Sequence, residues 1–174
     1  MKNPCILLRE RCGINQKDFA EKYDFHKTTM VYWDAGMYPE ISERMNRSLA
    51  KECAEKGIDA AGELLVGYGE EKLADAYTKW QILTRQANAA LFIGINPHNG
   101  NPKTTPFYQF ILDSTGSLQS FCKKLLVPAA SAMRYAKGHT VAMPDVIEEA
   151  LRDIEYPKLS ELVDLQQTWL KTHP

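Results

Sequence analysis

Apolar residues recur at helical spacing through the first sixty residues, in short segments that end at glycine or proline. In the segment HKTTMVYWDAG, Met30 and Trp33 are three residues apart and therefore share one face of a helix. The opposite face carries Lys27, Thr28, Val31 and Tyr32. This pattern predicts a short helix with one buried face and one displayed face.

Further short helices are predicted around this one. NPCILLRERCG has a proline at a helix start and Gly13 at its end, and GINQKDFAEKYDF has Asn15 at an N-cap position. MYPEISERMNRSLAKECAEKG is predicted to begin a helix at Pro39 and to end it at Gly57. The two central helices are joined by about three residues around positions 24–26, which is the spacing of a helix-turn-helix.

The stretch LRERCGINQKDFAEKYDFHKTTMVYWDAG resembles the DNA-binding domain of lambda-repressor-like (Xre-type) regulators. The resemblance covers about residues 3–55. It rests on residues of the expected type at Arg9, Gln16, Ala20, Phe25, Met30, Trp33, Asp34 and Gly36. The chain departs from the family pattern at Asp24, where glycine is usual, and at His26, where a small capping hydroxyl is usual.

The resemblance implies that Gln16 contacts a DNA phosphate and that Lys27, Thr28 and Tyr32 face base edges in the major groove. In this first copy we therefore expect DNA contacts from Gln16, Lys17, Lys27, Thr28, Thr29, Val31 and Tyr32. The alternative is a helical module kept for protein contacts, whose outward face is only solvated.

The pattern recurs at an offset of 102 residues. Its anchors appear in order in the pairs Pro4–Pro106, Asn15–Ser117, Phe19–Phe121, Ala20–Cys122, Tyr23–Leu125, Phe25–Val127, Trp33–Tyr135 and Gly36–Gly138. Beyond these pairs, the loop HTVAM is predicted to be three residues longer than its counterpart MY, so that PDVIEEALRDI matches PEISERMNRSL from Pro144 onward. The chain therefore reads as two helix-turn-helix units in tandem.

The displayed face of the second copy differs chemically from the first. Small apolar side chains can contact thymine methyl groups, and Arg134 can bind a guanine. We expect DNA contacts here from Ala129, Ala130, Ser131, Met133, Arg134 and Lys137. An Ala-Ala-Met surface that binds only protein is the alternative.

An apolar stripe from Glu70 to about Ile93 predicts one long amphipathic helix between the copies. At 1.5 Å per residue, a helix of this length would span about 36 Å. The turn-rich connector INPHNGNPKTTP follows it, and PKLSELVDLQQTWLKTHP is helical again. A homodimer through Trp80 or Trp169 is an alternative use of these stripes.

The predicted fold is therefore all-α, with two lambda-repressor-like units joined by a long amphipathic helix. Residues 1–60 form the first helix-turn-helix domain and residues 61–102 the bridging helix and connector. Residues 103–174 form a second helix-turn-helix-like domain with a C-terminal helix.

Composition narrows the functional classes. With 44% hydrophobic residues in 174, the chain can form a packed core, and its net charge of −1 argues against indiscriminate binding to polyanions. The four cysteines form no CxxC pair and are expected to be small buried hydrophobes, without a disulfide or zinc site. No apolar run is long enough to span a membrane, which predicts a cytoplasmic protein. We identified no catalytic constellation, cofactor motif or small-molecule site, and predict that the protein is not an enzyme.

The predicted function is sequence-specific binding of double-stranded DNA by a transcriptional regulator. The resemblance implies a repressor of phage or mobile-element type, and the two unlike displayed faces imply two unlike half-sites. One alternative is a DNA-binding accessory factor for recombination or plasmid maintenance. Another is a protein-interaction module without specific DNA binding.

Overall fold

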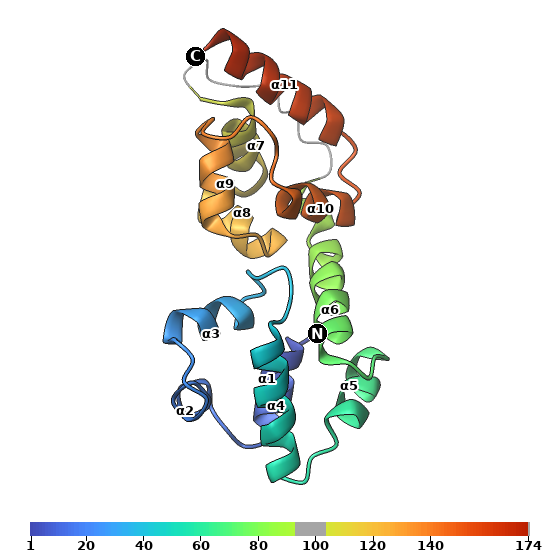
Figure 1. Cartoon of the computed structure of the whole chain (residues 1–174). Helices are drawn as coiled ribbons and strands as arrows, with labels where there is room; N and C mark the ends of the chain where they lie inside the picture. The colour runs from blue at the N-terminus through green and yellow to red at the C-terminus, as the bar shows by residue number, and fades with distance from the viewer. Residues whose placement is uncertain (93–103, 174) are drawn as a thin grey trace. The chain divides into compact units, whose positions relative to one another are not determined.

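The computed structural model describes residues 1–92 and 104–173, and every regular element in these residues is a helix (Figure 1). The predicted all-α class is confirmed. The chain divides into two units, residues 1–83 and residues 84–174. The predicted connector over residues 95–106 lies largely outside the described residues.

The first unit forms around a core of side chains from its first four helices. Its helices are α1 (Pro4–Arg11), α2 (Gln16–Lys22), α3 (Lys27–Asp34), α4 (Glu43–Glu55), α5 (Ala60–Tyr68) and most of α6 (Leu73–Ala87). Phe19, Met30, Met45 and Leu49 are fully buried. The predicted N-cap of α2 is confirmed, because the Asn15 side chain accepts a hydrogen bond from the backbone of the third helical residue.

The prediction that a helix begins at Pro39 is wrong. Helix α4 begins at Glu43, and the Ser42 hydroxyl accepts a hydrogen bond from the Met45 N–H at 3.2 Å. A serine hydroxyl satisfies one of the free N–H groups at a helix start, whereas a proline side chain has no acceptor. Pro39 therefore belongs to the loop that precedes the helix.

The second unit repeats the first four helices. Its elements are the short 3₁₀ helix η1 (Ala89–Leu91) and the helices α7 (Pro106–Thr115), α8 (Leu118–Leu125), α9 (Ala129–Ala136), α10 (Asp145–Asp153) and α11 (Leu159–Thr172). Helices α7 to α10 each begin 102 residues after α1 to α4. The predicted three-residue insertion before α10 is therefore wrong, because Pro144 occupies the position of Ser42 and not that of Pro39.

The helix that follows α5 is shorter than the bridging helix that the sequence predicted. Helix α6 has 15 residues, Leu73–Ala87, which corresponds to about 22 Å at 1.5 Å per residue. Immediately after it, the Asn88 side chain donates hydrogen bonds to the carbonyls of Thr84 and Lys124. Asn88 thus satisfies a free carbonyl of the last helical turn, and the chain continues into η1.

Residues 61–83 belong to the first unit and do not form a separate bridge. Helix α5 packs on α1 and α4, and the Gln81 amide donates to the carbonyls of Gly36 and Tyr38 at 2.9 and 2.8 Å. Trp80 is only 6% exposed and its indole donates to the Met1 carbonyl. The apolar stripe of α6 is therefore covered largely within this unit, and Trp80 is not displayed to a partner.

Candidate nucleic-acid interface

Helix α3 is held by its apolar face. Met30 is fully buried and Trp33 is 6% exposed, and the Trp33 ring meets the Phe25 ring edge-on at 5.6 Å. The Phe25 ring in turn stacks on Phe19 at 6.0 Å. The predicted phase of this helix is confirmed, so its other face points outward.

The outward face of α3 carries most of the residues predicted to contact DNA. Lys27, Thr28, Val31 and Tyr32 are exposed. Tyr32 is 46% exposed and packs edge-on against Tyr38 at 5.9 Å, which restrains its ring. Thr29 is half-buried, so it has less surface available to a ligand. The face offers an ammonium group, hydroxyl groups and an apolar methyl surface.

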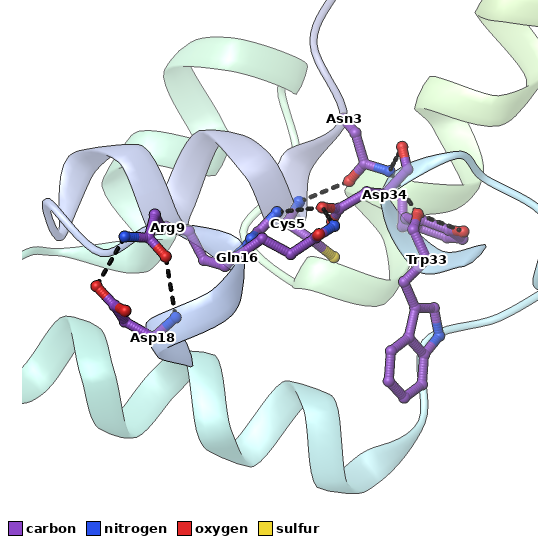
Figure 2. A network of polar contacts seen from close by, with 9 residues as sticks. Asn3, Cys5, Arg9, Gln16, Asp18, Trp33 and Asp34 are labelled. Carbon is purple, nitrogen blue, oxygen red and sulfur yellow. Dashed lines mark hydrogen bonds and ion pairs between the residues drawn. The ribbon is translucent and has the colours of Figure 1, made fainter. Parts of the chain in front are cut away.

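A buried polar network attaches the end of α3 to α1 and α2. The Arg9 guanidinium and the Gln16 amide both donate to the same Asp34 carboxylate oxygen, at 2.5 and 2.6 Å (Figure 2). The side chains of Arg9 and Asp34 are only 5% and 14% exposed. The Asn3 amide donates to the carbonyls of Trp33 and Asp34 at 2.8 and 3.2 Å. The C-terminal turn of α3 is thus fixed by side chains distant in sequence.

This network changes what Gln16 can do. One N–H of its amide is used by Asp34, and a primary amide keeps a second N–H for another acceptor. Its neighbour Lys17 is 81% exposed, and its ammonium group lies 3.9 Å from Glu21 across one helical turn. Gln16 and Lys17 therefore place one oriented donor and one exposed cation at the start of α2.

The turn between α2 and α3 accommodates both departures from the family pattern. Asp24 adopts a left-handed backbone conformation with φ of 53°, which non-glycine residues adopt infrequently. Arg44 donates to the carbonyls of Tyr23 and Asp24 at 2.8 and 2.6 Å and lies over the Phe25 ring. His26 is the N-cap of α3, with its ring nitrogen accepting from the Thr28 N–H. Asp24 thus forms the turn between the two helices, and His26 caps the start of α3.

Helix α2 is attached to α4 through one buried carboxylate. Glu52 is 1% exposed, and it accepts hydrogen bonds from the Lys22 ammonium at 2.6 Å and from the Tyr23 hydroxyl at 2.9 Å. Burial opposes its ionisation, but these two donors hold the pKa of Glu52 below its usual value. Burial and the same hydrogen bond raise the pKa of Tyr23 to about 12.

The second unit positions α9 as the first positions α3. Tyr135 and Ala132 are fully buried at the places of Trp33 and Met30. Leu126 has φ of 54°, matching Asp24 102 residues earlier. The hydrogen bond from Asn3 to the Asp34 carbonyl at the end of α3 also has a counterpart. At the equivalent positions, the Thr105 hydroxyl donates to the Ala136 carbonyl at 2.5 Å.

The displayed face of α9 carries the predicted residues of the second copy. Ala129, Ala130, Met133, Arg134 and Lys137 are exposed, and Ser131 is half-buried. The polar network of the first unit is absent beneath this face, because the positions of Arg9, Gln16 and Asp34 hold Ile111, Leu118 and Ala136. Ile111 and Ala136 are buried, so apolar packing replaces the ion pair.

Several residues that orient these helices were not identified from the sequence. Gln166 of α11 is fully buried; its amide donates to the Tyr135 carbonyl at 3.0 Å and accepts from the Phe107 N–H at 3.1 Å. In the first unit the Tyr77 hydroxyl donates to the Trp33 carbonyl at 3.3 Å. A polar residue on an otherwise apolar helical face was the only available signal for Gln166.

The prediction for the cysteines is confirmed as far as burial is concerned, because all four are buried and free. Across residues 1–92 and 104–173, no group of three or more His, Cys, Asp or Glu side chains is placed to hold a metal ion. In the same residues no helix is both long and apolar enough to cross a membrane.

Comparison with known proteins adds no relative: no family model, no curated protein and no solved structure matches the chain.

Proposed function

We propose that the protein binds double-stranded DNA sequence-specifically and regulates transcription, as a repressor that occupies a promoter. The observation that carries the proposal is α3, a helix of eight residues whose apolar face is buried and whose opposite face is exposed. A helix that is fixed by packing at one face and by hydrogen bonds at its end can act as a recognition helix in the major groove.

The side chains of α3 suit base recognition. The hydroxyl groups of Thr28 and Tyr32 and the ammonium group of Lys27 can bond to base edges, and Val31 can contact a thymine methyl group. Gln16 and Lys17 would bind phosphates beside the groove, which positions the helix without reading sequence.

The second unit would contact a second half-site. Its face carries Ala129, Ala130, Met133 and Arg134 where the first carries Lys27, Thr28, Val31 and Tyr32. Because these sets differ chemically, the proposed operator is bipartite and not palindromic. Tethering two modules in one chain raises the effective concentration of the second contact.

The experiment selects genomic fragments bound by the full-length protein and compares variants on the preferred site and on a scrambled duplex. Thr28→Ala and Tyr32→Ala should each weaken the preferred site by roughly 1–3 kcal/mol and leave scrambled DNA nearly unchanged. Lys17→Ala should weaken both duplexes alike. Val66→Ala, a change at an exposed residue of α5, is the matched control.

Three outcomes would contradict the proposal or one of its parts. Absence of any shifted duplex at physiological salt would favour a protein-interaction module. Footprinting that finds two chains on a palindrome, with the second unit off the DNA, would remove the bipartite operator while keeping DNA binding. Binding to preferred sites without any effect on a linked promoter would favour an accessory DNA-binding role.

A further inference from the structure

The two helix-turn-helix segments differ sharply in charge. Residues 15–38 of the first unit carry three lysines and four acidic residues. The equivalent residues 117–140 carry Lys123, Lys124, Arg134 and Lys137 and no aspartate or glutamate. Although the whole chain is nearly neutral, one short segment of the second unit is strongly basic.

In the part of the chain that the structure describes, these cations also have no acidic partner. In the first unit, Lys22 is bound by Glu52 and Glu55 of α4 at 2.6 and 2.5 Å. The positions equivalent to these two glutamates hold Ile154 and Pro157.

Within the described residues, none of the four cations of the second unit forms an ion pair. Lys123, Arg134 and Lys137 are exposed and Lys124 is half-buried. Their charge is therefore available to an external anion.

The remaining displayed side chains of α9 offer few groups that can read bases. Ala129, Ala130 and Met133 have no hydrogen-bond donor, and Met133 is 36% exposed. Helices α8 and α9 have eight residues each, so each is about 12 Å long, which is close to the Debye length at physiological salt. A segment with four cations and few base-reading groups suits phosphates better than a particular base sequence.

We propose that the α8–α9 segment anchors the protein to the phosphate backbone of duplex DNA and has little base preference. This proposal rests on the proposed DNA-binding function. The first unit then supplies most of the sequence discrimination, and the second supplies most of the salt-dependent attraction. The half-site beneath the second unit is correspondingly permissive.

The test measures the slope of log K against log salt concentration for the full-length protein. The variant Arg134→Gln/Lys137→Gln removes two cations from α9, and Lys123→Gln/Lys124→Gln removes two from α8. The matched control is Lys158→Gln/Lys171→Gln, which removes two cations from the same unit outside the segment. Circular dichroism verifies that each variant keeps its helical content.

The α9 variant should reduce the steepness of the slope by about 1.8, because each lost phosphate contact removes about 0.9. The ratio of affinities for preferred and scrambled duplexes should stay unchanged, as should the slope of the control. An unchanged slope in both α8 and α9 variants, or an equal loss in the control, would overturn the anchor while leaving the proposed function intact. If the parent protein binds no duplex, the proposed function itself fails and the anchor fails with it.

Discussion

The buried network of Arg9, Gln16 and Asp34 makes a quantitative prediction about the first unit. Asp34→Ala removes the carboxylate and leaves the Arg9 guanidinium, whose side chain is 5% exposed, without its counter-ion. Removing one partner of a buried ion pair costs about 3–5 kcal/mol, because the remaining charge stays desolvated. That loss is large beside a total stability of about 5–15 kcal/mol.

The second unit supplies the matched control. The variant Arg9→Ile/Gln16→Leu/Asp34→Ala installs the residues that the second unit carries at the equivalent positions. Replacing a buried ion pair by well-packed apolar residues is often neutral or stabilising. We therefore expect this triple variant to be at least about 2 kcal/mol more stable than Asp34→Ala.

Urea unfolding followed by tryptophan fluorescence measures these differences. The chain has three tryptophans, and a Trp169→Phe background leaves Trp33 and Trp80, both in the first unit. The signal then reports the unfolding of that unit even if the two units unfold separately. Equal m-values would establish that the midpoints report stability alone.

Two results would refute this reasoning. A loss below about 1 kcal/mol in Asp34→Ala would mean that the pair behaves like an exposed salt bridge and does not hold α3. A triple variant as unstable as Asp34→Ala would mean that the loss does not come from an unpaired buried charge.

Three further predictions concern stability. Trp33→Ala should cost about 3–5 kcal/mol in urea unfolding, as truncations of large buried aromatic residues do, and an unchanged midpoint would contradict the packing of α3. Asp24→Gly should raise the free energy of unfolding by about 1 kcal/mol, because Asp24 is exposed and has a φ of 53° that glycine adopts more easily. Leu126→Gly should not, although φ is 54° there, because Leu126 is 6% exposed and the variant loses its buried side chain. Equal effects of the two variants would contradict this. The pKa of Glu52 is lowered in the folded protein, so its contribution is present above its unfolded pKa and is lost as pH falls through the folded value. Melting temperatures should therefore depend less on pH below about 4.5 in Glu52→Gln than in the parent, and parallel curves would argue against this linkage.

The sequence predicted the burial of Met30, Trp33 and Tyr135 because helical periodicity is a local property. A spacing of three residues specifies a common face wherever the helix packs. The position of Asn15 at a helix start was predictable for the same reason, since an N-cap bonds within its own first turn.

The partners that fix α3 could not be predicted, because they are far apart in the chain. Asp34 was assigned only as a family position, yet it receives bonds from residues 18 and 25 positions earlier. The prediction that α4 begins at Pro39 was wrong because proline is frequent at helix starts, but here the N-cap is the Ser42 side chain. The predicted length of the bridging helix was wrong because the apolar stripe continues past Ala87. The helix ends there, and the Asn88 amide donates to carbonyls of two segments.

The constant spacing of 102 residues between equivalent helices has a consequence for how such a protein can change. In a dimer of identical chains, every substitution occurs twice, so both halves of a target site must tolerate it at once. Here a substitution at Tyr32 leaves Arg134 at the matching position untouched. Under the proposed function, the half of the operator that the first unit reads can change without any change in the second unit, and one gene can acquire a new target by single mutational steps.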